Sequence, residues 1–341
     1  MIPSDPGSPD PIDPEPRRPG AGTFTIEGRS APGLFVVGWL ATLVGLVAIA
    51  VALLAGGSTA AAILLTAGLA VLSVGLVAGA GAQGIERRSS AKAGDEGGYA
   101  GPSPFLVFAA SVPVSLLAVI LLGIPLTIIG IAVDGPVGRV ASVALQAVVY
   151  IGLIRLLVVD SGVLTWAQMG VRRFDRNALA ELATGALWAG PVILATWIVA
   201  AVLYLLFPVT PVSPLPPAGE AVGFALNLLA GAIIAPVGEE LLFRAFATTA
   251  WARSLGDRRA LIRGALFFSI VHVLNISGAS AGEALELALV GFAARIPVAL
   301  ALGWLFLRRG SVWAPIGLHA TFNAILLIVG ELAARSGILP A

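Results

Sequence analysis

The sequence predicts an all-α protein: a polytopic transmembrane helical bundle of about nine spans, with a cytoplasmic N-terminus and the C-terminus outside. Hydrophobic residues make up 58% of its 341 residues, and charged residues only 11%. Apolar runs of about 20 residues recur along the chain, and a helix of that length crosses the hydrocarbon core of a bilayer. Abundant glycine and alanine suit close packing of helices within a membrane.

Composition also limits the chemistry that the chain can perform. The chain has no cysteine, which excludes disulfides, thiol nucleophiles and cysteine-ligated metals. Its two histidines are His272 and His319, so any imidazole chemistry must use them. The net charge of +1 gives no indication of nucleic-acid binding. We therefore expect membrane lipids, and no nucleic acid, among the partners.

The N-terminal part divides into a tail, a hairpin and a linker. Residues 1–32 are rich in Pro, Gly, Asp and Arg and should form a disordered cytoplasmic tail. The tail lacks the basic start and short apolar core of a cleavable signal peptide, so the first apolar run is expected to be an uncleaved anchor. Residues 33–82 contain apolar runs at 33–54 and 60–80, which we expect to form an accessory two-helix transmembrane hairpin. The polar residues 83–103 follow as a cytoplasmic linker.

Residues 104–221 are expected to form further transmembrane helices, with spans near 104–131, 140–159 and 186–207. Between the last two spans, tryptophan and arginine are mixed with apolar residues. That mixture is typical of a helix lying along the membrane surface, so we predict an interfacial helix near 160–183.

Four more spans are predicted in residues 222–335. A long helix should run from about 222 to 251, and the other spans lie near 261–274, 284–306 and 312–333. The span at 261–274 is short for a bilayer crossing.

The distribution of basic residues sets the orientation. With a cytoplasmic N-terminus, nine spans place the basic residues of the tail, the linker, the interfacial segment and two later loops inside. Arg139 and Arg335 remain outside, and Arg244 and Arg295 lie within spans. Three interpretations of Arg295 stay open: it snorkels to the interface, neutralises an acidic pair or binds a carboxylate of a substrate.

The most informative stretch is Ala-Pro-Val-Gly-Glu-Glu-Leu-Leu-Phe-Arg at 235–244, inside a long apolar helix. A charged side chain at the centre of a membrane helix costs about 2.5–3.5 kcal/mol on insertion scales. Glu240 and Arg244 are four residues apart, so they share a helix face and can pair. Glu239 is turned about 100° away. The pattern indicates a paired structural acid beside an available base, and the alternative is a buried ion-pair network that only locks helices together.

Two later spans also carry polar residues at helical spacing. Phe268 and His272 are four residues apart, as are His319 and Asn323. A rise of ~1.5 Å per residue places Glu239, His272 and His319 in the cytoplasmic half of the bilayer, where they can meet. A lone buried His or Asn most often bonds two helices together, whereas a set of polar residues at one depth indicates a functional site.

This set of residues favours activation of water. No serine sits in a nucleophile elbow and cysteine is absent, so covalent acyl-enzyme chemistry has no candidate nucleophile. A glutamate partnered by a histidine can act as a general base. A second histidine, with an asparagine on the same helix face, can donate hydrogen bonds to an oxyanion. Together they would hydrolyse a peptide bond inside the membrane.

Three alternatives stay open at this point. Glu, His and His side chains could bind Zn²⁺ with an open position, although no His-Glu-x-x-His helix is present. A transporter could use Glu and His as a proton relay, but its halves would be expected to repeat, and no convincing repeat is present. A non-catalytic membrane scaffold could retain the polar cluster for folding or partner binding.

Three motifs resemble, in order, those of the CPBP (Abi) family: Glu-Glu-x-x-x-Arg at 239–244, Phe-x-x-x-His at 268–272 and His-x-x-x-Asn at 319–323. The family consists of intramembrane proteases related to type II CAAX prenyl endopeptidases and to bacteriocin-processing or immunity proteins. The run from Trp313 to His319 also resembles the region of the third motif. By this resemblance, residues 222–335 form the CPBP-like catalytic helices.

The resemblance implies a role for each matching residue. Glu239 would activate water with the assistance of His272, and His319 and Asn323 would form the oxyanion hole. The reaction would be a glutamic intramembrane endopeptidase reaction on a membrane-associated or lipidated peptide or protein, in the cytoplasmic half of the bilayer.

By the same resemblance, Glu240 and Arg244 would position the site, and no cofactor is expected, with Zn²⁺ as the less favoured alternative. Nothing in the sequence indicates recognition of a prenyl group. The alternative within the family is a scaffold or bacteriocin-immunity protein without catalysis. The Ala-, Gly- and Arg-rich chain without cysteine is typical of a bacterium, so we expect a multi-pass protein of the plasma membrane.

Overall fold

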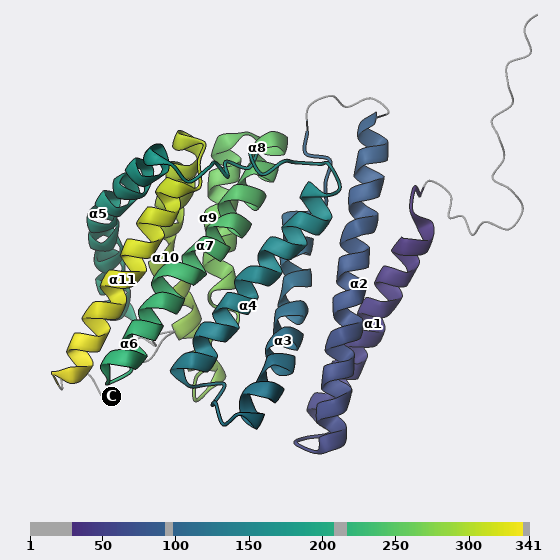
Figure 1. Cartoon of the computed structure of the whole chain (residues 1–341), viewed down its shortest axis with the longest axis horizontal. Coiled ribbons are helices and arrows are strands. Elements are labelled where there is room, and N and C mark those ends of the chain that lie inside the picture. Colours follow the sequence, from purple (N-terminus) through teal and green to yellow (C-terminus); the bar gives the residue numbers. More distant parts are fainter. Residues whose placement is uncertain (1–28, 93–97, 208–216, 337–341) are drawn as a thin grey trace, which may run out of the picture.

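The computed structural model describes residues 29–92, 98–207 and 217–336. Within these ranges the chain forms helices joined by turns, without a strand, which confirms the all-α prediction (Figure 1). The predicted tail at 1–32 lies outside the described residues as far as residue 28, and the first helix begins at Pro32.

Eight helices in the described part of the chain are long and apolar enough to cross a membrane. They are α1 (Pro32–Leu54), α2 (Thr59–Lys92), α3 (Pro104–Ile128), α4 (Pro136–Ile154) with its extension η1 (Arg155–Val159), α5 (Arg176–Leu206), a continuous helix from Ala221 to Leu255, α10 (Ala281–Arg309) and α11 (Trp313–Arg335). These helices confirm the polytopic transmembrane bundle. The remaining predicted span is α9 (Asp257–Val271), a 15-residue helix that ends one residue before His272.

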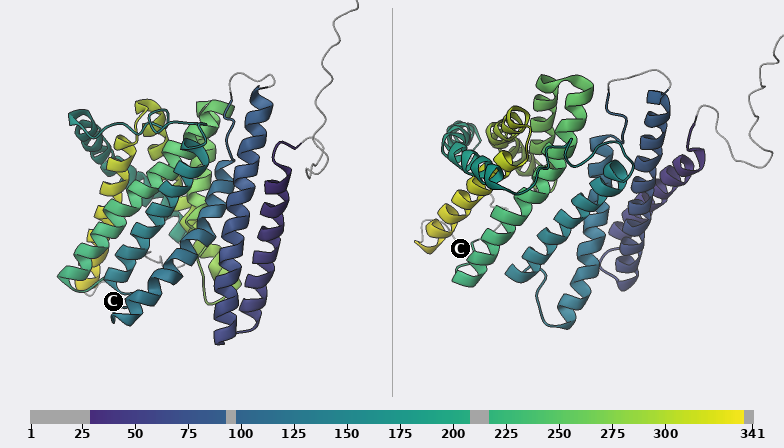
Figure 2. Two further views of the ribbon diagram at one scale, coloured as in Figure 1. Left: turned by 45° about the vertical axis from the view of Figure 1, so that its right-hand side comes forward. Right: turned by 45° about the horizontal axis from the view of Figure 1, so that its top comes forward.

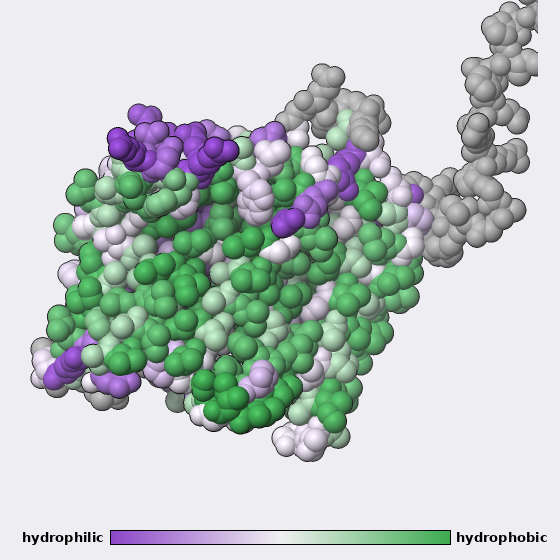
Figure 3. All heavy atoms as spheres, viewed as in Figure 1, coloured by the Kyte–Doolittle hydropathy of each residue, from purple (hydrophilic) through white to green (hydrophobic). Residues whose placement is uncertain are grey.

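The outer surface fits a membrane environment. Large apolar side chains are exposed along the long helices, among them Leu54, Ile128, Leu187 and Leu205. On the face drawn in Figure 3, hydrophobic residues form a broad band, and hydrophilic residues gather at its two ends. The protein is therefore a multi-pass membrane protein.

Two local predictions differ from the structure. Helix α2 continues to Lys92, so the first ten residues of the expected linker at 83–103 are helical. The prediction of an interfacial helix near 160–183 was wrong. Residues 160–175 form turns and irregular structure, and α5 begins at Arg176. Gly162 and Gly170 adopt positive φ angles of 76° and 73°, which interrupt a helix. Asp175 then caps α5: its carboxylate accepts hydrogen bonds from the backbone N–H groups of Asn177 and Ala178, at 2.9 and 3.0 Å.

The hairpin of α1 and α2 lies at one edge of the bundle (Figures 1 and 2). Glycines allow the two helices to approach closely, because a Cβ at Gly38 or Gly45 would collide with the backbone of α2. Whether this hairpin is accessory to function stays a prediction.

Helix α9 is fixed by a cluster of aromatic rings. The ring of Phe267 packs edge-on against Phe105 of α3 and Trp251 of α8 (Thr249–Leu255), with centroids 4.9 and 5.6 Å apart. Phe243 contacts both Phe267 and Phe268. These contacts hold the end of α9, and therefore His272, against the long helix at 221–255.

Helix α11 is fixed by an even closer contact with α5. A Cβ added at Gly185 would overlap the carbonyl oxygen of Ala314, and one added at Gly317 would overlap the carbonyl oxygen of Leu182. Backbone therefore touches backbone at this crossing, as is typical of glycine-mediated packing in membranes. Because His319 follows Gly317 by two residues, this crossing also sets the position of its imidazole.

We predict that Gly185→Ala forces α5 away from α11 and lowers the free energy of unfolding by about 1–3 kcal/mol, as overpacking does in cores. The matched control is Gly190→Ala on the same helix, where a Cβ would meet open space. The control should be neutral or stabilising by up to ~1 kcal/mol, because alanine favours helix. Unfolding in mixed detergent micelles measures both, and equal stabilities for the two variants would contradict the prediction.

Candidate active site

The site is built on the long helix at 221–255, which alternates between α and π geometry. Its parts are α6 (Ala221–Leu228), η2 (Leu229–Ile234), α7 (Ala235–Glu240), η3 (Leu241–Thr248) and α8. Pro236, the second residue of α7, lacks an N–H group and follows the π segment η2 by two positions. In η3, the Thr248 hydroxyl donates to the carbonyl of Phe243, five residues earlier, at 2.8 Å. Wide turns of this kind are frequent at functional sites.

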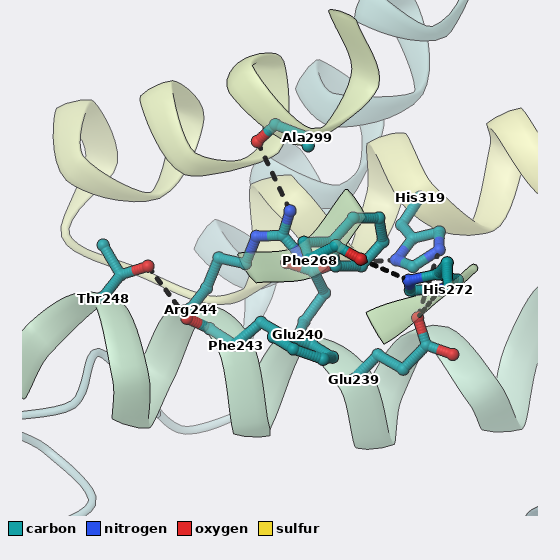
Figure 4. A network of polar contacts seen from close by, with 9 residues as sticks. All are labelled: Glu239, Glu240, Phe243, Arg244, Thr248, Phe268, His272, Ala299 and His319. Atoms are coloured by element: carbon teal, nitrogen blue, oxygen red, sulfur yellow. Dashed lines mark hydrogen bonds and ion pairs between the residues drawn. The ribbon is translucent and has the colours of Figure 1, made fainter. Parts of the chain in front are cut away.

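Glu240 is enclosed in a buried ion-pair network (Figure 4). Arg244 Nη1 donates to Glu240 Oε1 at 2.9 Å, and Nδ1 of His319 lies 2.8 Å from the same oxygen. The side chains of Glu240 and Arg244 are 0% and 2% exposed. The structure therefore confirms the predicted pairing of Glu240 with Arg244, and it adds His319 to the pair.

Arg244 ties the network to two more helices. Its Nη2 donates to the carbonyl of Ala299 on α10 at 3.4 Å. Its guanidinium lies 4.3 Å from the ring centroid of Phe268 on α9, a cation–π contact. Arg244 thus contacts α9 and α10 and also pairs with Glu240. Glu240 in turn contacts α11 through His319.

Glu239 faces the Nε2 atoms of both histidines. Its Oε2 lies 3.4 Å from Nε2 of His272 and 3.8 Å from Nε2 of His319. The side chains of Glu239 and His272 are 21% and 27% exposed, in contrast to the enclosed Glu240. Figure 4 shows the second carboxylate oxygen of Glu239 pointing away from both imidazoles. The two adjacent glutamates therefore differ in environment, as the 100° offset between them predicts.

The second nitrogen of each imidazole determines what Nε2 can do. Nδ1 of His272 lies 2.6 Å from the carbonyl oxygen of Phe268, and a carbonyl can only accept, so Nδ1 carries the proton. Nδ1 of His319 likewise donates to the carboxylate of Glu240. In the neutral imidazoles, both Nε2 atoms are then acceptors directed at Glu239. With both imidazoles neutral, three proton acceptors converge on one place; when His319 is protonated, its Nε2 is a donor, and Glu239 and Nε2 of His272 remain as acceptors.

Asn323 stands apart from this network. Its Nδ2 donates to the carbonyl oxygen of Gly231 in η2 at 2.8 Å. The structure thus brings five of the six predicted residues into one contact network and places the sixth on the adjacent turn of α11. One amide hydrogen of Asn323 is used by Gly231, and the second is available to another acceptor.

Two contributors to the site were not assigned from the sequence. Phe268 supplies the carbonyl for His272 and the ring for Arg244, and its position four residues before His272 was a usable signal. Ala299 contributes only a backbone carbonyl, for which the sequence gives no signal.

The site contains donor atoms that could in principle bind a metal. Two imidazole nitrogens and a carboxylate oxygen are donor types that suit Zn²⁺. Among residues 29–92, 98–207 and 217–336, however, no group of three or more His, Cys, Asp or Glu side chains has an arrangement that could hold a metal ion. We therefore assign no metal ligands, and chelation is the experiment that decides metal dependence.

Residues 221–325 match the family model described as type II CAAX prenyl endopeptidase Rce1-like. This segment, about a third of the chain, is similar to the CAAX protease family. The matched range includes the long helix, α9, α10 and the first half of α11, and thus every residue of the network and Asn323. It confirms the resemblance drawn from the three motifs and points to a CAAX-type protease. Comparisons with curated proteins and with solved structures gave no match.

We predict that Arg244→Met lowers the free energy of unfolding by about 3–5 kcal/mol, because it leaves the buried carboxylate of Glu240 without its cation. The matched control is Arg253→Met on α8, whose exposed side chain should contribute less than about 0.5 kcal/mol. The double variant Glu240→Gln/Arg244→Met removes both charges and should lose about 0.5–3 kcal/mol less than the sum of the single losses. Additive losses in detergent unfolding would contradict this pairing.

Proposed function

We propose that the protein is an intramembrane endopeptidase that hydrolyses peptide bonds with a water molecule activated by Glu239 and His272. The observation that carries the proposal is the convergence on Glu239 of two imidazole Nε2 atoms whose Nδ1 atoms are already engaged. A water molecule at this place meets acceptors for its protons, which is what a general-base mechanism needs.

In the proposed reaction, the oxygen of water attacks the carbonyl carbon of the scissile peptide while its proton passes to Glu239. His272 lies 3.4 Å from the carboxylate and shares this proton. The negative charge moves to the carbonyl oxygen of the substrate. As the tetrahedral intermediate collapses, the proton is returned to the amide nitrogen, the C–N bond breaks, and an acid and an amine leave.

His319 and Asn323 are the proposed donors to the oxyanion. Both lie on α11, one helical turn apart, so they share a face. A protonated His319 can donate from Nε2 while Nδ1 remains bonded to Glu240, and Asn323 can donate the amide hydrogen that Gly231 does not use. Donors preorganised in this way stabilise the transition state more than the ground state.

Glu240 and Arg244 are proposed to position this machinery without touching the substrate. The carboxylate of Glu240 accepts the N–H of His319 Nδ1 and so fixes the orientation of the imidazole, and Arg244 holds that carboxylate in place by its own hydrogen bond. The residues that contact water or substrate are then Glu239, His272, His319 and Asn323.

The proposed substrate is a membrane-associated or lipidated peptide or protein. All four contact residues lie on or directly after helices of a multi-pass membrane protein, so a substrate has to approach within or along the bilayer. The CAAX-type family supports a lipidated substrate, whereas nothing in the described side chains selects a particular lipid.

The orientation is also proposed. Arginine-bearing segments meet at one end of the bundle, where Arg88 of α2 donates to the carbonyl of Ser161 and Trp313 Nε1 donates to the carbonyl of Arg172 at 3.2 Å. The positive-inside rule assigns this end to the cytoplasm. We propose the plasma membrane of a bacterium, with the N-terminus cytoplasmic and the C-terminus outside.

Single cysteines test the orientation without background, because the chain has none of its own. We expect Glu220→Cys, exposed before α6, to react with a membrane-impermeant maleimide in intact cells. Arg258→Cys, exposed at the start of α9, should react only after the cells are permeabilised. The reverse labelling pattern would overturn the proposed orientation.

The catalytic assignment predicts that Glu239→Gln lowers kcat by about 10²–10⁴-fold, because the amide cannot accept the proton of water. Cleavage of a panel of fluorogenic peptides, prenylated ones included, by detergent-purified protein is the measurement. His272→Ala should lose activity in the same range. Glu220→Gln, an exposed carboxylate before the same helix, is the matched control and should keep full activity.

A strong chelator should leave the activity of the wild-type protein unchanged. Loss of activity on chelation, with recovery on addition of Zn²⁺, would replace the glutamate mechanism by a metal-dependent one. Absence of cleavage by wild type, with all variants folded and equally stable, would favour the non-catalytic scaffold.

A further inference from the structure

Arg295 is a second arginine within the transmembrane part of the protein, and its environment differs from that of Arg244. Arg244 contacts a carboxylate, a carbonyl and an aromatic ring. In the described part of the chain, Arg295 makes one hydrogen bond, from Nη1 to the carbonyl of Gly291 at 2.7 Å, and no ion pair. A guanidinium has five N–H donors, so most of those of Arg295 remain available.

Arg295 lies on α10 one helical turn before Ala299, whose carbonyl contacts the network. Ala299 contacts Arg244 through its carbonyl, and Arg295 precedes Ala299 on α10 by four residues, hence on the same face. The charges of Arg295 and Glu239 interact electrostatically, as do those of Arg295 and Tyr204 on α5. The guanidinium therefore lies close enough to Glu239 for their charges to interact.

The immediate surroundings of the guanidinium adjoin His272. A Cβ added at Gly291 would lie 3.0 Å from Arg295 Nη1 and 3.3 Å from the side chains of Val273 and Ile276. Val273 directly follows His272 in the segment after α9. Gly291 thus leaves room for the guanidinium beside the segment that carries the proposed proton-sharing imidazole.

An intramembrane arginine without a carboxylate in contact is costly, since insertion of Arg at a helix centre is unfavourable by about 2.5–3.5 kcal/mol. Such residues mark functional sites by default. The planar fork of a guanidinium matches a carboxylate in two parallel hydrogen bonds. The proposed substrate is a peptide, and the anionic groups of an unmodified peptide are carboxylates.

We propose that Arg295 is a specificity-determining residue that binds a carboxylate of the peptide substrate next to the scissile bond. The inference rests on the proposed endopeptidase function and adds the anionic subsite to it. The carboxylate belongs either to the C-terminus of the peptide or to an acidic side chain, and both sources present the same chemistry to Arg295.

The test compares equilibrium binding of three fluorescent tetrapeptides to the full-length protein in detergent, by fluorescence anisotropy. The first ends in a free carboxylate, the second is its C-terminal carboxamide, and the third is the carboxamide with aspartate as its last residue. The wild-type protein should bind at least one carboxylate-bearing peptide about 10- to 100-fold more tightly than the plain carboxamide, the range expected for hydrogen bonds to charged groups. Preference for the first or the third peptide identifies the source of the carboxylate.

Arg295→Gln should abolish this preference, and Arg295→Lys should retain part of it, because lysine keeps the charge and loses the fork. Arg308→Gln, an exposed arginine in the last turn of the same helix, is the matched control and should bind like wild type. The preference is a ratio within each variant, so a general loss of stability does not imitate the effect. In cleavage assays, Arg295→Gln should raise KM for the preferred peptide and leave kcat within about twofold.

Equal binding of all three peptides by wild type, no measurable binding, or an unchanged preference in Arg295→Gln would overturn the inference. An equal loss of kcat for charged and uncharged peptides would also overturn it, because that result assigns Arg295 to the ionisation of Glu239. Carboxylate preference without cleavage would support the subsite while the proposed function fails. Cleavage without carboxylate preference would support the proposed function, whereas the carboxylate subsite at Arg295 would fail.

Discussion

The rest of the site depends on the ion pair between Glu240 and Arg244 in the interior of the bundle. A carboxylate there is tolerated only with a partner, and Arg244 lies 2.9 Å away on the next helical turn. Desolvation offsets much of the attraction within a buried pair, so its main contribution is geometric. Arg244 contacts α9 and α10, and Glu240 fixes the imidazole of His319 on α11. Four helices thus meet at one pair of charges.

Two neighbouring glutamates on α7, a helix between two π segments, have different environments because adjacent residues are turned by about 100°. Glu240 faces the helix bundle, and Glu239 faces the two Nε2 atoms and is partly exposed. Pro236 in the first turn of α7 has no N–H donor, and the hydrogen bond from the Thr248 hydroxyl to the Phe243 carbonyl supports the wide turn that follows. One carboxylate is therefore enclosed by the protein, and the other is left partly exposed.

Much of this arrangement could be predicted from the sequence, because membrane spans and intramembrane charges leave strong signals. The apolar runs predicted the membrane helices, and the i, i+4 spacing predicted the ion pair between Glu240 and Arg244. The proximity of Glu239, His272 and His319 could be predicted from the estimated depth of each residue in the bilayer. The interfacial helix at 160–175 failed because composition does not show how Gly162, Gly170 and Asp175 interrupt a helix and restart it. The carbonyl of Ala299 could not be predicted, since any residue supplies one.

The early end of α9 has a consequence for the bilayer itself. After Val271 the chain forms turns and irregular structure until α10 begins at Ala281, and Leu274 and Asn275 in this stretch are exposed. Backbone N–H and C=O groups outside a helix cannot be left against lipid tails, so they need protein or water as neighbours. This requirement falls on the residues directly after His272. The segment whose backbone needs protein or water as neighbours is therefore adjacent to His272, the imidazole for which we propose a hydrolytic water.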